Sequence, residues 1–165
     1  MMACQWGPQH PDRALLARVG ALVAAEARQF HDRHGVALTV HQHRGRPLQT
    51  ADEVAAYAAR FDGVSSALTA DTAHLALCGV DPARFLRDFA PLIDLVHLKD
   101  LRDGAFIWLG DGTLDLGSCF VALAETGYDR ALVADVYESP GPADMPAAAR
   151  RWIAERVLRP MRAAP

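Results

Sequence analysis

Apolar side chains recur along the 165-residue chain at two spacings, one typical of helices and one typical of buried strands. Between Arg13 and His34 they repeat every three or four positions, which predicts a helix that Gly35 ends. Short apolar or β-branched runs then alternate with helix-spaced segments. The predicted strands are residues 36–40, 66–70, 93–96 and 131–134, and the predicted helices that follow them are residues 50–61, 81–89, 117–126 and 145–158.

Strands that alternate with helices imply parallel strands joined by right-handed crossovers. Apolar runs without alternation fit strands that are covered on both faces. The predicted fold class is therefore α/β, built from parallel β/α units. We expect residues 1–35 to form a lead-in and a helix, and residues 36–165 to form four β/α units. Thr50-Ala-Asp-Glu53 matches a capping box, and Asp81 followed by Pro82 marks a second helix start.

The composition excludes several classes of protein. The chain is 51% hydrophobic and 22% charged, with a net charge of −3, which is an ordinary globular balance. There is no basic excess or stripe, so we expect no nucleic-acid partner. No run approaches about 18 apolar residues, so we expect no membrane partner. The N-terminus lacks a secretory pattern, and three widely spaced cysteines fit a reduced, cytoplasmic protein.

Each predicted strand ends on a residue that can bind a metal. These residues are His41 with His43, then Asp71, His97 and Asp135. In parallel α/β folds, functional groups gather at the C-terminal ends of the strands. Imidazole together with carboxylate suits Mn²⁺, Co²⁺, Zn²⁺ or Mg²⁺. We therefore expect a divalent metal that polarises a carbonyl or hydroxyl oxygen of a polyol substrate.

Several individual assignments stay open at this stage. His41 and His43 alternate across a strand end, so only one faces the interior, and His43 is favoured slightly because it lies further beyond the strand. Lys99 is the one lysine among 17 basic residues, which favours a function specific to an amine. Arg44 either binds a phosphate or carboxylate or lies in solvent. Trp108 either covers the substrate or packs on the rim.

Four motifs carry a resemblance to a known family. They are Asp71-Thr-Ala-His74-Leu, Gly79-Val-Asp-Pro82, Val96-His97-Leu-Lys99-Asp100 and Leu109-Gly-Asp-Gly112, in that order. Together they resemble the xylose isomerase-like TIM-barrel superfamily, which includes sugar-phosphate isomerases/epimerases and inosose dehydratases. Val40-His-Gln-His43, followed by the helix from Thr50, resembles the inosose-dehydratase branch most closely. The resemblance covers residues 36–138.

The resemblance implies roles for particular residues. Asp71 and His97 are similar to the metal ligands of the sixth and seventh barrel strands. Asp135 stands where the family usually has Glu, and its reach is shorter by one methylene. His74 is similar to a residue that binds metal or substrate, and Lys99 would contact substrate oxygens beside the metal.

The resemblance also predicts a partial barrel. A (β/α)₈ barrel takes roughly 250 residues, whereas this chain offers four units that resemble the C-terminal half. The family's fifth-strand Glu is not evident, and His41 or His43 stands near that position. Four parallel strands leave two open edges, which invite pairing with another strand. We therefore expect a homodimer in which two copies rebuild an eight-stranded closure.

The leading functional hypothesis is a metal-dependent isomerase or epimerase that acts on a sugar or cyclitol. It would transfer a proton or hydrogen next to a carbonyl, and Asp135 and His41 are the candidate bases. One alternative is an inosose dehydratase-type lyase. Another is a truncated, catalytically inactive half-barrel that binds a sugar or a partner chain.

Overall fold

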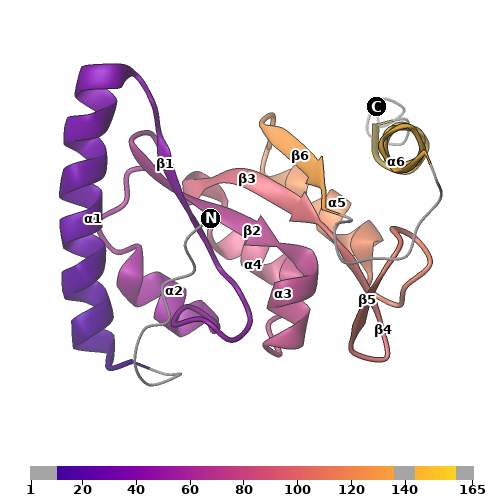
Figure 1. Ribbon diagram of the computed structural model, residues 1–165, viewed down its shortest axis with the longest axis horizontal. Helices are drawn as coiled ribbons and strands as arrows, with labels where there is room; N and C mark the ends of the chain where they lie inside the picture. The colour runs from indigo at the N-terminus through magenta and orange to yellow at the C-terminus, as the bar shows by residue number, and fades with distance from the viewer. Residues whose placement is uncertain (1–10, 136–143, 159–165) are drawn as a thin grey trace.

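The computed structural model describes residues 11–135 and 144–158, with the backbone alone at the last two positions. Figure 1 shows the order of the elements along the chain. They are α1 (Arg13–His34), β1 (Leu38–His41), α2 (Ala51–Tyr57), β2 (Ser66–Asp71), α3 (Thr72–Leu77), α4 (Pro82–Asp88), η1 (Ala90–Leu92), β3 (Ile93–Leu98), β4 (Asp100–Arg102), β5 (Ala105–Ile107), α5 (Leu116–Glu125), β6 (Ala131–Ala134), α6 (Met145–Ile153) and η2 (Ala154–Leu158). The expected lead-in at residues 1–10, and residues 136–143, lie outside the described residues.

The main sheet has four strands in the order β1-β2-β3-β6. Every neighbouring pair is parallel, which confirms the predicted α/β class with parallel β/α units. Figure 1 shows the sheet running between α1 at one edge and α6 at the other. Because the strands are parallel, all four C-terminal ends lie at the same side of the sheet.

The core forms between the sheet and the helices that follow its strands. All six residues of β2 are buried, since it is a central strand with a neighbour on either side. Leu68, Val96 and Leu98 pack there against apolar side chains of α2, α4 and α5. Gly20 of α1 faces the Tyr57 carbonyl so closely that a Cβ at this position would overlap the carbonyl oxygen. The α1 helix therefore packs backbone to backbone on the end of α2.

Local signals for helix ends are confirmed by the structure. The Thr50 hydroxyl accepts from the Glu53 N–H while the Glu53 carboxylate accepts from the Thr50 N–H, as a capping box requires. Asp81 accepts from the Arg84 N–H at the start of α4. Gly35 ends α1 in the left-handed conformation, with φ of 66°.

Two elements differ from the prediction. The six-residue helix α3 begins directly where β2 ends, and it is too short to show helical periodicity in the sequence. Residues 101–112, for which the sequence predicts neither a strand nor a helix, contain a hairpin, β4–β5, whose strands pair antiparallel. Its turn residues Asp103 and Gly104 both have positive φ, the geometry of a type I′ turn, for which Asp-Gly is a strong sequence signal.

None of the helices in the described part of the chain is long and apolar enough to cross a membrane.

Candidate metal centre

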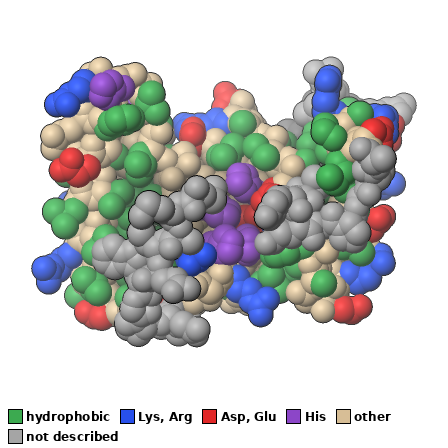
Figure 2. All heavy atoms as spheres, in the orientation of Figure 1, with side chains coloured by type: hydrophobic (Ala, Val, Ile, Leu, Met, Phe, Trp, Pro, Cys, Tyr) green, Lys and Arg blue, Asp and Glu red, His purple; other side chains and the backbone are tan. Residues whose placement is uncertain are grey.

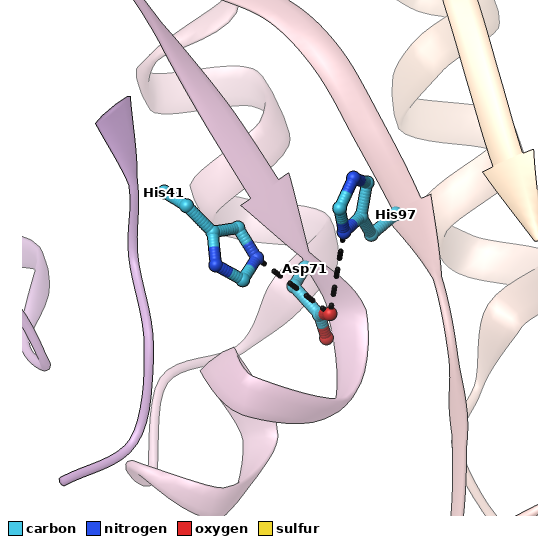
Figure 3. Close-up of side chains that lie close together, drawn as sticks. All are labelled: His41, Asp71 and His97. Carbon is cyan, nitrogen blue, oxygen red and sulfur yellow. Dashed lines mark ion pairs between the residues drawn. The ribbon is translucent and has the colours of Figure 1, made fainter. Parts of the chain in front are cut away.

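Three side chains converge at the C-terminal end of the sheet. His41 is the last residue of β1, Asp71 is the last residue of β2, and His97 lies one residue before the end of β3. The register of the central strands pairs Asp71 directly with His97. Figure 3 shows the two imidazole rings pointing toward the Asp71 carboxylate from either side. Each of the three adjacent strands thus places one candidate metal ligand at the same end of the sheet.

The distances within this cluster suit a shared cation better than direct hydrogen bonds. His41 Nε2 lies 3.7 Å and His97 Nδ1 lies 3.9 Å from Asp71 Oδ2. The three ligand atoms all lie within 4.8 Å of one another. The 3.7 and 3.9 Å separations exceed hydrogen-bond length, and each is compatible with two atoms that lie about 2.0–2.2 Å from one ion.

Hydrogen-bond accounting gives the same result. His41 Nε2, Asp71 Oδ2 and His97 Nδ1 are all buried, and none has a hydrogen-bond partner. A buried polar atom without a partner is costly, and such atoms are uncommon in native proteins. Three of them face one point, so a divalent cation there would satisfy the whole set.

Asp71 uses its two carboxylate oxygens for different purposes. The side chain has no exposed surface. Its Oδ1 accepts from the backbone N–H groups of Ala73 and His74, at 3.0 and 2.9 Å, and so caps α3. Its Oδ2 faces the two histidines. Capping and metal binding are therefore compatible roles for this residue.

The protonation states at neutral pH fit metal binding. Burial alone would raise the pKa of Asp71, but the neighbouring His41 side chain, the His74 N–H and the charges of His74 and Lys99 outweigh it and lower that pKa. Burial, and then the nearby His41, lower the pKa of His97 below its ordinary 6.5. Asp71 is therefore an anion and His97 a neutral imidazole, which are the forms that bind a metal.

A second pair of groups adjoins the cluster. Asp135, the residue after β6, places its Oδ2 3.6 Å from His97 Nδ1 and 3.0 Å from Lys99 Nζ. The Lys99 side chain is only 4% exposed, and its ammonium lies 4.4 Å from the centre of the Phe106 ring. A compact ammonium on a flexible stem fits this enclosed position, which a planar guanidinium would fill differently.

The sequence slightly favours His43 as the histidine that faces the site, but the structure has His41 in that position. The structure brings His41, rather than His43, to Asp71 and His97. The strand ends at His41, and His43 already lies in the loop, where its N–H donates to the Leu48 carbonyl. The His43 ring packs 3.7 Å from the His74 ring, centre to centre, and its Nδ1 lies 2.7 Å from the Arg44 carbonyl oxygen.

His74 and Phe106 form a wall beside the cluster. His74 is buried, its Nδ1 has no hydrogen-bond partner, and its ring meets the Phe106 ring edge-on at 5.2 Å. Phe106 comes from β5 and was missed in the sequence, although the Asp103-Gly104 turn signal marks the hairpin that carries it. Of the remaining candidates, Arg44 is exposed and Trp108 is half-buried just after β5.

Two further residues of the sequence motifs, Thr72 and Asp100, form hydrogen bonds with the backbone next to the site. The Thr72 hydroxyl lies 2.6 Å from the Lys99 carbonyl oxygen and accepts from the Lys99 N–H at 2.9 Å, which ties α3 to the end of β3. The buried Asp100 carboxylate accepts from the N–H groups of Leu101, Gly110, Gly112 and Leu114. It thereby fixes the loop that follows the hairpin.

The free energy of unfolding of the metal-free protein is expected to fall as the pH decreases from about 6.5 to about 4. Burial lowers the pKa of His74 from 6.5 to about 4 in the folded chain. In that window the unfolded chain binds a proton that the folded chain does not, so acid favours unfolding. Above pH 6.5 His74 is neutral in both states, so the free energy of unfolding no longer depends on its protonation.

Urea denaturation of chelator-treated protein at several pH values measures this dependence. The variant His74→Gln should show a shallower fall in the free energy of unfolding between pH 6.5 and 4. The same slope in both proteins would contradict the assignment. His31→Gln, on the surface helix α1, serves as the matched histidine control.

A parallel β/α sheet whose strands follow chain order, with functional groups at the C-terminal strand ends, is the arrangement found in (β/α)-barrel proteins. Residues 6–156 match the profile of the xylose isomerase-like TIM barrel family, and the chain belongs to that family. The resemblance found in the sequence motifs is thereby confirmed.

The curated relatives of the chain are about twice as long as the region that they share with it. It is 31% identical over 138 residues to inosose dehydratase of Clostridium tetani (strain Massachusetts / E88), which covers 70% of this chain and 46% of the relative. It is 28% identical over 144 residues to inosose dehydratase of Bacillus thuringiensis (strain Al Hakam), which covers 74% and 48%. The chain thus spans about half the length of the curated relatives it matches.

Solved structures show the same fold. A structure of L-ribulose 3-epimerase matches with a TM-score of 0.74 and 22% identity, over 94% of this chain and 58% of that one. A structure of the IOLI protein with a bound zinc atom matches with a TM-score of 0.74 and 17% identity, over 96% and 61%.

Proposed function

We propose that the chain forms the site of a metal-dependent enzyme that moves a proton next to a carbonyl in a sugar or cyclitol. One observation carries this proposal, namely the convergence of three unsatisfied ligand atoms beside the buried Lys99, which pairs with the half-buried Asp135 carboxylate. The metal would hold the substrate oxygens, and the pair would act on the carbon next to them.

His41 Nε2, Asp71 Oδ2 and His97 Nδ1 would hold the ion, and Asp135, whose Oδ2 lies 3.6 Å from His97 Nδ1, would lie beside it. Two imidazoles with carboxylates suit Mn²⁺, Co²⁺ or Zn²⁺ better than Mg²⁺, which prefers oxygen ligands and water. The zinc bound in the IOLI structure supports this choice of ion. When bound, such an ion supplies Lewis-acid polarisation of a carbonyl or hydroxyl oxygen.

The proton-transfer step falls to the chain's own groups. Asp135 accepts the proton from the carbon next to the carbonyl, and the bonding electron pair moves toward the carbonyl oxygen. The Lys99 ammonium lies 3.0 Å from Asp135 Oδ2. It donates a hydrogen bond to the carbonyl oxygen of the substrate and stabilises the negative charge that develops there. The wall of His74 and Phe106, with the His43 ring packed on His74, would bind the substrate's apolar face and exclude water, with Arg44 and Trp108 at the rim.

The same pair favours a dehydratase as the second candidate. In an elimination, Asp135 takes the proton from carbon, a double bond forms, and the departing hydroxyl takes a proton from Lys99 to leave as water. A base and an acid 3.0 Å apart are the two groups that this reaction needs. The identity of 31% to a dehydratase that acts on inosose by its name supports this candidate.

Turnover of the metal-loaded protein tests the proposal. The protein is stripped with a chelator, reloaded with Mn²⁺, Co²⁺ or Zn²⁺, and incubated in D₂O with inosose and a panel of ketoses. We expect metal-dependent exchange of deuterium at the carbon next to the carbonyl, with loss of water in the dehydratase case. Sugar binding without exchange or turnover would contradict an enzyme and support the binding-only half-barrel.

A further inference from the structure

Lys99 lies one residue beyond the end of β3, where the ladder to β2 has already stopped. The last pair of that ladder joins Asp71 to His97. β2 ends there because Asp71 caps α3 and the chain turns into the helix. Successive residues of a strand point their backbone groups to opposite sides, and the Leu98 carbonyl accepts from the Asp135 N–H on the β6 side. The backbone groups of Lys99 therefore face the side on which β2 has ended.

One hydroxyl group takes the place of a neighbouring strand at this position. The Thr72 hydroxyl accepts from the Lys99 N–H at 2.9 Å and donates to the Lys99 carbonyl oxygen at 2.6 Å. Thr72 is the first residue of α3, and it is only 1% exposed. Buried backbone groups need partners, and a hydroxyl can both donate and accept at a single atom. Thr72 thus satisfies both backbone groups of Lys99.

Thr72 connects the metal cluster with the lysine. It directly follows Asp71, the central candidate ligand, and it holds the backbone of Lys99 across the sheet. Figure 2 shows histidine side chains gathered on one face of the molecule, between α1 and α6. The Lys99 side chain is enclosed beside this cluster, where its ammonium lies 3.0 Å from Asp135 Oδ2 and 4.4 Å from the centre of the Phe106 ring. These contacts require the backbone at Lys99 to stay in place.

We propose that Thr72 is a positioning residue that fixes the Lys99 ammonium relative to the metal cluster. The inference rests on the proposed function, since it names the residue that keeps the lysine and the metal ligands at one separation. Thr72 acts through Lys99 rather than on the substrate. A displacement of about 1 Å at a reacting group can cost about 100-fold in rate. Loss of the hydroxyl therefore lowers kcat with little effect on metal affinity.

Kinetics of the Mn²⁺-loaded protein with inosose measure this effect. Thr72→Val removes the hydroxyl at nearly constant volume, and it should lower kcat about 10- to 100-fold with an unchanged Mn²⁺ dissociation constant. Thr72→Ser keeps the hydroxyl and should retain most of kcat. In the Lys99→Met background Thr72→Val should add little, because its effect passes through the amine.

Thr69→Val is the matched control for the loss of a buried hydroxyl. Thr69 is buried within β2, and its hydroxyl bonds to the Thr39 hydroxyl at 2.9 Å instead of to Lys99. The control should lower the free energy of unfolding but keep kcat. A purely structural role of Thr72 would make the two valine variants behave alike.

A spectroscopic measurement without substrate separates this inference from the proposed function. Lys99 is the only lysine of the chain, so protein grown with ¹³Cε-labelled lysine gives one NMR signal for the ε-methylene. The ring current of Phe106 shifts that signal upfield while the ammonium lies over the ring. We expect Thr72→Val to move the signal toward that of a solvent-exposed lysine, and Thr72→Ser and Thr69→Val to leave it in place.

Failure of this inference and failure of the proposed function give different results. Absence of turnover in the unmodified protein would contradict the proposed function and leave the NMR test intact. An unmoved Lys99 signal in folded Thr72→Val, or additive losses of kcat from Thr72→Val and Lys99→Met, would overturn the inference. If Thr72→Val does not fold, Thr72→Ser decides. An unmoved signal in the serine variant supports the hydroxyl, and a displaced one would assign the effect to the methyl group instead.

Discussion

Replacing Asp71 by asparagine is expected to lower the affinity for Mn²⁺, Co²⁺ and Zn²⁺ by about 100-fold or more. Loss of a group that merely supports a ligand typically costs 10- to 100-fold, and Asp71 is proposed as a ligand itself. Asparagine keeps an oxygen for the N–H groups of Ala73 and His74, so the α3 cap survives. The substitution therefore removes the charge and Oδ2 with little change in the fold.

Isothermal titration calorimetry of chelator-treated D71N measures this loss. Asp81→Asn is the matched control, because Asp81 also caps a helix through the Arg84 N–H but lies away from the strand-end cluster. The control should bind metal as the unmodified protein does. If D71N retains full affinity, the three-residue cluster is not the metal site.

Replacing Lys99 by methionine is expected to reduce kcat by about 100-fold or more while metal stays bound. Methionine preserves much of the buried stem but removes the ammonium that lies 3.0 Å from Asp135. In the proposed mechanism this ammonium stabilises the charge on the substrate oxygen or protonates the leaving hydroxyl, and such roles typically contribute 10²- to 10⁴-fold. The loss should fall on kcat more than on KM, since the interaction strengthens as charge develops.

A double-mutant cycle with Asp135→Asn tests whether the two residues act together. If they form one unit, the double variant should be little worse than either single variant. Arg102→Met, on the exposed end of β4, removes a cation from the hairpin that follows Lys99 and should leave kcat unchanged. Additive losses from Lys99→Met and Asp135→Asn would contradict the shared role.

The sequence predicts the position of the site better than its detailed chemistry. The sequence places Asp71, His97 and Asp135 at the site because each follows a short apolar run, and parallel strands bring their ends to one side of the sheet. The order of His41 and His43 could not be settled in this way. A side chain's direction depends on where the strand stops, and β1 stops at His41.

The parts that the sequence did not predict depend on short elements and contacts between distant residues. The α3 helix is too short for a periodic signal, and its start is fixed by the Asp71 cap. The β4–β5 hairpin has three-residue strands, so only its Asp103-Gly104 turn marks it. The contacts of Lys99 with Asp135 and Phe106 join segments that are apart in the sequence, and only the fold brings them together.

Anomalous diffraction from crystals grown with Zn²⁺ or Mn²⁺, recorded on both sides of the metal's absorption edge, tests the metal centre most directly. We expect one strong peak about 2.0–2.2 Å from His41 Nε2, Asp71 Oδ2 and His97 Nδ1. At saturating metal, the absence of a peak between these three atoms, or a peak on other residues alone, would contradict the site.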